Sequence, residues 1–192
     1  MRQNLARRAA LVDAAIEVLA RDGARGLTFR AVDAEAGVPK GTASNYFAHR
    51  DDLLNQAGGR IYERLRPDDA TMEAMAEGPA TRARTAELVR DVVERVTAFR
   101  TGYLALLELR LEATRRPELR AVLTQRVSED VANNVSAHLA SGLPGDADAV
   151  RMLYLATNWL VVERLTLPDV FPEQQAGDLI TSLVERLLPP DQ

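Results

Sequence analysis

Apolar residues recur at intervals of three and four along almost the whole chain, which is the spacing of amphipathic helices. No segment alternates between apolar and polar residues for long enough to predict a strand. The pattern therefore predicts an all-α protein of about nine helices. In the first predicted helix, which stops at Asp22-Gly23, the apolar stripe consists of Leu5, Ala9, Val12, Ile16 and Leu19.

Turn-forming residues divide the rest of the helical pattern. A fourth helix is expected to begin near Arg50, to bend at Gly58-Gly59 and to end at Arg66-Pro67. Residues 67–80 contain Gly78 and Pro79 and are expected to form a loop or one weak turn. Further helices are predicted at residues 81–100, 103–115, 118–141, 147–167 and 173–188.

The segment from Leu27 to Leu54 has the pattern of two short helices joined by a tight turn. Thr28 is suited to cap the first of these, and Gly37 supplies the positive φ that ends it. The second is expected to open at Val38-Pro39-Lys40-Gly41-Thr42, with a cation and a hydroxyl in its first turn. This arrangement is that of a helix-turn-helix motif, although many helical hairpins with a glycine turn bind nothing.

Charge is distributed unevenly along the chain. Residues 1–66 carry 11 Lys and Arg against 8 Asp and Glu, whereas the remainder carries 13 against 20, so the first part is basic and the second acidic. Lys40 is the only lysine, since every other basic residue is arginine. An acidic body with a mildly basic N-terminal part favours contact with DNA at one end only.

Other classes of chemistry find little support. There is no cysteine, so disulfides, thiol catalysis and thiolate metal sites are excluded. His49 and His138 lie far apart and belong to no metal-binding spacing, so we expect no metal, no cofactor and no enzyme activity. The strongly apolar stretch at residues 152–162 is shorter than the roughly 20 residues that span a bilayer. We therefore expect a soluble protein of the cytoplasm that does not bind membranes.

The segment resembles the helix-turn-helix of the TetR family of transcriptional regulators in the order and spacing of its residues. Three positions depart from the family pattern. Asp33 replaces a small residue, Ser44 replaces a tyrosine that reaches a phosphate, and Arg50 stands where lysine is common. The residues in register with the pattern are Leu27, Thr28, Val32, Ala36, Gly37, Val38, Gly41, Phe47 and Leu53.

The resemblance implies a helix-turn-helix DNA-binding domain of three helices at residues 1–48. A helical regulatory domain at residues 49–192 would bind a ligand and form the dimer. The implied function is a ligand-responsive repressor that binds a pseudo-palindromic operator in double-stranded DNA as a homodimer, with a small-molecule effector. The alternative is a helical interaction protein that keeps this fold but has lost operator binding, for which Ser44 and Asp33 are the reasons.

Roles in DNA binding follow from position and chemistry. Lys40 is placed for a base edge or a phosphate, and Arg30 has the fork geometry that suits guanine. A partly buried position for Tyr46 and a purely capping role for Thr28 stay open as alternatives. The predicted DNA-binding residues are Thr28, Arg30, Pro39, Lys40, Gly41, Thr42, Ser44, Asn45, Tyr46 and Arg50.

The region after residue 80 is expected to hold both the ligand pocket and the dimer interface. Side chains with an apolar body and a polar tip, together with apolar wall residues, are the candidates for the pocket, although each could simply fill core. The candidates are Phe99, Tyr103, Leu107, Arg110, Asn134, Tyr154, Asn158 and Trp159. The last two helices have more apolar positions than one core is expected to bury. The resemblance implies a four-helix bundle between two chains, which would contain Leu153, Leu160, Val161, Ile180, Leu183, Val184 and Leu187.

Overall fold

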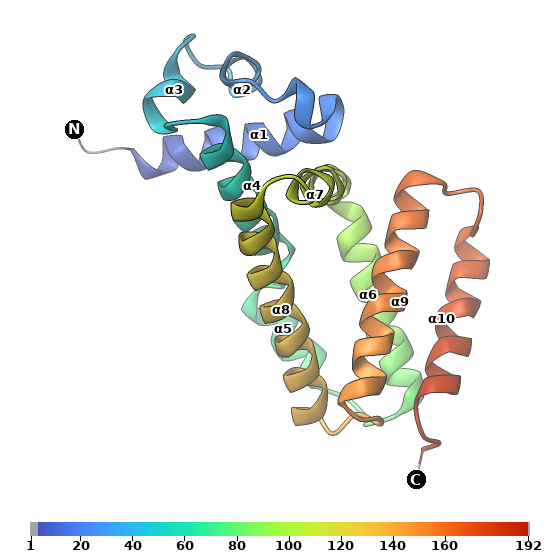
Figure 1. Cartoon of the computed structure of the whole chain (residues 1–192). Coiled ribbons are helices and arrows are strands. Elements are labelled where there is room, and N and C mark those ends of the chain that lie inside the picture. The colour runs from blue at the N-terminus through green and yellow to red at the C-terminus, as the bar shows by residue number, and fades with distance from the viewer. Residues whose placement is uncertain (1–3, 192) are drawn as a thin grey trace. The chain divides into compact units, whose positions relative to one another are not determined.

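The computed structural model describes residues 4–191 and shows ten helices and no strand in that range (Figure 1). The predicted all-α class is confirmed. The helices are α1 (Leu5–Gly26), α2 (Phe29–Glu35), α3 (Thr42–Tyr46), α4 (Arg50–Leu65), α5 (Asp69–Ala76), α6 (Arg82–Ala98), α7 (Arg100–Ala113), α8 (Pro117–Ala140), α9 (Ala147–Thr166) and α10 (Glu173–Leu187).

The helix that the sequence missed is α5. Residues 67–80 were expected to form a loop or one weak turn, but eight of them form a helix. The Asp68 side chain accepts a hydrogen bond of 2.8 Å from the backbone N–H of Thr71, and this bond caps the helix. Asp is among the residues preferred at this capping position, so the signal was present in the sequence and was outweighed by Gly78 and Pro79.

Packing divides the chain into two units, which we describe separately. The first unit runs to Arg66 and resumes from Phe99 to Arg126. The second consists of Pro67–Ala98 and of the chain from Val127 onwards. The predicted domain boundary at residue 48 follows the DNA-binding motif and stays a prediction.

In the first unit α1 is the central element, since it packs against α2, α4 and α7. Its helical course is interrupted at Gly23, where φ is 68° and the chain kinks, close to the predicted stop. α2 packs in turn against α3, and α4 against α7. The fully buried apolar side chains of this unit include Leu11, Ile16, Leu19, Phe47, Leu53, Leu54, Ile61 and Leu109.

α4 is continuous, so the predicted bend at Gly58-Gly59 is wrong. A Cβ atom at Gly58 would lie 3.1 Å from a methyl group of Leu123 and 3.9 Å from one of Leu109. A side chain at residue 58 would therefore crowd α7 and the beginning of α8. The glycine allows helices to approach one another closely within this unit, and it does not loosen α4.

In the second unit α6, α9 and α10 pack against one another (Figure 1). The buried side chains at their centre correct part of the predicted dimer interface. A side chain that is already covered by its own chain cannot meet a second chain without unfolding. The four predicted interface residues buried in this way are Leu153, Val161, Ile180 and Val184.

The opposite face of α9 is exposed and apolar. Met152 is 47 % exposed, Leu155 68 % and Trp159 65 %. Their spacing of three and four residues puts them on one face of the helix. Within residues 4–191, no helix combines the length and the apolar character that crossing a membrane would require.

Candidate nucleic-acid interface

The segment from α2 to α3 presents polar and basic groups at the surface of the first unit. Thr28, Arg30, Pro39, Lys40, Gly41, Ser44 and Asn45 are exposed, whereas Thr42 and Tyr46 are half-buried. Val32, Ala43 and Phe47 are buried beneath them. Apolar residues thus anchor the segment from inside, and most of its hydrogen-bonding side chains reach the surface.

α3 begins at Thr42, later than the sequence predicted. Gly41 precedes it with φ of 88°, a left-handed conformation that glycine adopts without the strain a side chain would cause. Lys40 therefore lies in the turn that leads into α3 and not in its first turn. An exposed lysine at this place has the reach to contact a base edge or a phosphate, so its predicted role does not depend on the helix starting earlier.

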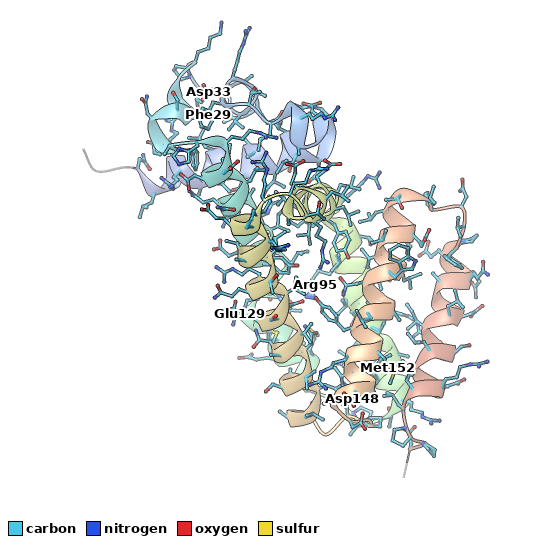
Figure 2. The ribbon with its side chains drawn as sticks, viewed as in Figure 1. Phe29, Asp33, Arg95, Glu129, Asp148 and Met152 are labelled. Atoms are coloured by element: carbon cyan, nitrogen blue, oxygen red, sulfur yellow. The ribbon has the colours of Figure 1, made fainter. Side chains whose placement is uncertain are left out.

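Asp33 organises the turn between α2 and α3. Its side chain is buried, with 2 % of the residue exposed. One carboxylate oxygen accepts a hydrogen bond of 2.7 Å from the backbone N–H of Gly41, and the other accepts one of 2.7 Å from the N–H of Ala43. Figure 2 labels Asp33 on α2, next to Phe29. The carboxylate therefore satisfies N–H groups at the start of α3 that have no partner within the helix.

This contact changes the meaning of a departure from the family pattern. Asp33 replaces a small residue of the family pattern, and it was therefore one of the two reasons for the alternative that operator binding has been lost. In the structure it holds α3 in place against α2. The available signal was the position of an aspartate one turn before a glycine turn and a short helix. Sequence reasoning did not use it.

The hydroxyl groups near α3 also bond to backbone. Thr42 donates to the carbonyl oxygen of Pro39 at 2.6 Å, and Ser44 donates to that of Gly41 at 2.9 Å. The Thr28 oxygen accepts from the N–H of Ala31 at 3.1 Å, which is the predicted helix cap. A hydroxyl oxygen can take part in further hydrogen bonds, so these contacts fix rotamers without excluding a phosphate.

Arg50 makes contacts to backbone that the sequence did not predict, and its phosphate contact stays a prediction. Its Nε donates a hydrogen bond of 3.0 Å to the carbonyl oxygen of Leu27, and its guanidinium also bonds the carbonyl oxygen of Ala24. Ala24 lies in the last turn of α1, and Leu27 follows that helix directly. Arg50 therefore joins the start of α4 to the end of α1, with Nε and one terminal nitrogen of its guanidinium.

Arg8 fixes the other end of α3. It donates a hydrogen bond of 2.7 Å to the carbonyl oxygen of Tyr46 and one of 2.8 Å to the side chain of Gln56. Its guanidinium carbon lies 4.8 Å from the centre of the Phe47 ring. α1, α3 and α4 are thus connected through one side chain. Nothing local in the sequence indicates these contacts of Arg8.

A cavity of about 620 Å³ lies in the same unit, beside the start of α2. Two of its four arginines are engaged by carboxylates, since Arg116 contacts Glu112 at 2.8 Å and Asp51 at 2.5 Å, and Arg115 contacts Glu112 at 2.8 Å. Hydrogen bonds from Arg116 and Arg115 hold the pKa of Glu112 below its usual value. The network braces α4 and α7. The cavity is lined by Arg25, Leu27, Thr28, Arg50, Glu112, Arg115 and Arg116.

The predicted ligand-binding residues are divided between the two units. Phe99, Tyr103, Leu107 and Arg110 belong to the first unit, whereas Asn134, Tyr154, Asn158 and Trp159 belong to the second. In the first group Tyr103 is buried, and the guanidinium of Arg64 lies 3.9 Å from the centre of the Phe99 ring. Phe99 and Tyr103 therefore take part in the packing of their own unit.

In the second group only some residues face inward. Trp159 lies on the exposed face of α9, and exposed Asn134 donates to the backbone of Asp130 on its own helix. The hydroxyl of Tyr154 donates a hydrogen bond of 2.9 Å to Asp130. Burial raises the pKa of Asp130, and this hydrogen bond partly offsets the effect. Sequence reasoning selected Tyr154 but not the half-buried carboxylate of Asp130 beside it.

Among residues 4–191, no group of three or more His, Asp or Glu side chains could hold a metal ion. His138 bonds to the carbonyl oxygen of Pro144 at 2.9 Å, which ties the end of α8 to the following turn.

Comparison with known proteins agrees with this arrangement. Residues 11–57 match the family model described as bacterial regulatory proteins, tetR family, and residues 80–190 match the one described as tetracyclin repressor-like, C-terminal domain. The HTH-type transcriptional regulator BetI of Agrobacterium fabrum (strain C58 / ATCC 33970) is 30 % identical over 146 residues, which cover 76 % of this chain and 69 % of BetI.

Two solved structures are similar over nearly their whole length. The multidrug binding protein EbrR in complex with imidazole is 32 % identical, with a TM-score of 0.70 and coverage of 97 % of both chains. A TetR-family member from Streptomyces coelicolor A3 is 31 % identical, with a TM-score of 0.69 and coverage of 95 % of this chain and 98 % of that one. The helix-turn-helix and the two matched regions show that this chain belongs to the TetR family of DNA-binding transcriptional regulators, which are not enzymes.

Proposed function

We propose that this protein is a ligand-responsive repressor that binds a pseudo-palindromic operator as a homodimer in the cytoplasm. The observation that carries the proposal is the segment from α2 to α3, which Asp33 and Arg8 hold at its two ends. Its exposed groups include Arg30, Lys40 and Asn45. Rigid support from beneath with polar and cationic groups above is what sequence-specific contact with a groove requires.

Dimerisation is supported by the exposed apolar face of α9. A stripe that contains Met152, Leu155 and Trp159 is unfavourable in water and is suited to a second copy of the same helix pair. Leu160, Leu183 and Leu187 are half-buried in the single chain and stay predicted interface residues. Two helix-turn-helix motifs related by a two-fold axis would contact two half-sites about one helical turn of DNA apart.

A small-molecule effector is supported by relatives. Structures of EbrR, the multidrug binding protein, were solved in complex with ethidium, proflavin and malachite green as well as imidazole. In this chain, Tyr154 and Asp130 place a polar pair inside the second unit. A ligand bound near such a pair would favour one arrangement of the helices, and operator affinity would then respond to the ligand.

Selection of DNA from a random pool tests the proposal. We expect the enriched fragments to contain two related half-sites about one helical turn apart. Gel shifts on the enriched sequence should show affinity that falls steeply with salt, because each neutralised phosphate releases counterions. If no sequence is enriched while the folded protein is dimeric, the alternative of a TetR-fold interaction protein, for which Ser44 remains the reason, is the better account.

A further inference from the structure

A cavity of about 370 Å³ lies within the second unit, between α5 and α6. This volume falls in the range of small-molecule sites, roughly 300 to 1,000 Å³. Three of its lining residues are charged, and the others are apolar or carry a single hydroxyl. The lining residues are Thr71, Ala74, Met75, Arg84, Asp91, Val92 and Arg95.

The two arginines that line the cavity have buried donor atoms without an acceptor. The Nε atoms of Arg84 and Arg95 are buried and make no hydrogen bond to any residue in the part of the chain that the structure describes. The other nitrogen atoms of Arg84 are engaged, one with Glu87 at 3.4 Å and one with the carbonyl oxygen of Ala74 at 2.9 Å. A buried donor without an acceptor is unfavourable, and a ligand oxygen would remove that penalty.

Arg95 is the less satisfied of the two. Burial lowers its pKa, and the negative charges of Asp130 and Asp91 offset this only in part. Asp130 is already bonded to the hydroxyl of Tyr154, which holds the carboxylate in place. Figure 2 labels Arg95 on α6. Its guanidinium is thus half-buried near carboxylates that it does not contact in an ion pair within residues 4–191.

The unsatisfied donors indicate the ligand. Glu87 contacts Arg84, and Asp91 and Asp130 lie near Arg95, so the excess at this site is of buried N–H donors without an acceptor and not of positive charge. A carboxylate matches the planar fork of a guanidinium and accepts from Nε and a terminal nitrogen together. Met75, Val92 and Ala74 offer an apolar surface to the rest of the molecule.

We propose that the cavity between α5 and α6 binds a small amphipathic monocarboxylate, with its carboxylate on Arg95 and Arg84 and its apolar body against Met75 and Val92. The proposal rests on the proposed ligand response, since it names the chemical class of the effector. It does not depend on operator binding.

Three probes with the same apolar body and different charge test the proposal: octanoate, octanol and octylammonium. Binding to the DNA-free protein is measured by isothermal titration. We expect octanoate to bind at least about tenfold more tightly than either of the other two. Equal or tighter binding of octylammonium, or no binding of octanoate at millimolar concentration, would overturn the proposal.

Variants locate the carboxylate. Arg95→Met keeps an apolar stem in place of the aliphatic part of the side chain and removes the fork, and it should weaken octanoate binding about tenfold or more while octanol binding changes little. Arg151→Met is the matched control, because Arg151 is exposed on α9 and pairs with Asp148 at 2.6 Å. If Arg95→Met fails to fold, Arg84→Met is expected to weaken octanoate binding as well. A folded Arg95→Met protein with native affinity for octanoate would refute the assignment.

A separate gel shift on the selected operator distinguishes two failures. Loss of octanoate binding with operator binding intact would reject the carboxylate site and leave the regulator. Octanoate binding by a protein that selects no DNA would keep the site and reject the repressor.

Discussion

The buried carboxylate of Asp33 and the backbone N–H of Gly41, eight positions apart in the chain, are joined by a hydrogen bond of 2.7 Å. The same carboxylate accepts a second hydrogen bond from Ala43, within α3. α3 has only five residues, and so short a helix is not stable by itself. Its position therefore depends on contacts from outside, and Asp33 provides two of them at its N-terminal end.

Replacing Asp33 with alanine should weaken operator binding although Asp33 itself is buried. The change leaves two N–H groups at the start of α3 without acceptors, and we expect it to lower the free energy of unfolding by about 1 to 3 kcal/mol. Gel shifts at a temperature where the variant is folded measure the effect on DNA. Glu35→Ala is the control, since Glu35 lies at the end of α2 and pairs with Arg21 at 2.6 Å. Native operator affinity in a folded Asp33→Ala protein would contradict the positioning role.

Arg30 and Arg50 should separate DNA recognition from folding. Arg30 is exposed on α2, so Arg30→Ala should leave thermal stability unchanged and cost about 1 to 3 kcal/mol at particular operator positions. Arg50 bonds to the carbonyl oxygens of Leu27 and Ala24, so Arg50→Ala should lower the free energy of unfolding by about 1 to 3 kcal/mol. Thermal melts and competition gel shifts on single-base operator variants measure the two effects. A stable Arg50→Ala protein with uniformly weaker DNA binding would restore the phosphate contact.

These cases show which features the sequence could predict. Apolar spacing was sufficient for the α1, α4 and α6–α10 patterns, because a helix buries one face whatever its partners are. The DNA-binding segment was found because its motif is local. The backbone contacts of Arg50 were not predicted, because nothing local indicates that a guanidinium reaches carbonyls more than twenty residues earlier. Asp33 was undervalued for a similar reason, since its role depends on where the chain returns after Gly37.

The predicted dimer interface includes side chains that the single chain already buries, and the reason is physical. α9 is apolar on two faces, and periodicity does not reveal which face its own unit covers. Val161 and Leu153 lie on the covered face, whereas Leu155 and Trp159 lie on the open one. The choice depends on how α6 and α10 pack against α9, and that packing is a tertiary property.

Charged substitutions on the two faces of α9 and α10 should therefore have different results. Leu155→Glu should yield a folded monomer, because its side chain is exposed in the single chain. Val184→Asp should unfold the second unit, because burying an unpaired charge costs about 3 to 5 kcal/mol. Circular dichroism and light scattering measure folding and mass, and Ser182→Glu on the exposed side of α10 is the control. A Leu155→Glu protein that stays dimeric would place the interface elsewhere.

Tyr103 should make stability sensitive to alkaline pH. Burial raises the pKa of Tyr103 from 10.0 to about 12, with Arg110 opposing the shift and Tyr62 adding to it. Between these two pH values the folded chain holds the phenolic proton and the unfolded chain loses it, so the free energy of unfolding must fall as pH rises. The contribution of Tyr103 is fully present below pH 10 and declines until pH passes the folded pKa of about 12.

Denaturation with urea at a series of alkaline pH values, for the native protein and for Tyr103→Phe, isolates this contribution. Phenylalanine has no proton to lose, so its curve should fall less steeply above pH 10, by a total on the order of 2 to 3 kcal/mol. Loss of the hydroxyl itself changes stability by an amount that does not depend on pH, so the difference in slope is the decisive quantity. Parallel curves for the two proteins from neutral to strongly alkaline pH would mean that Tyr103 ionises equally readily in the folded and unfolded chain.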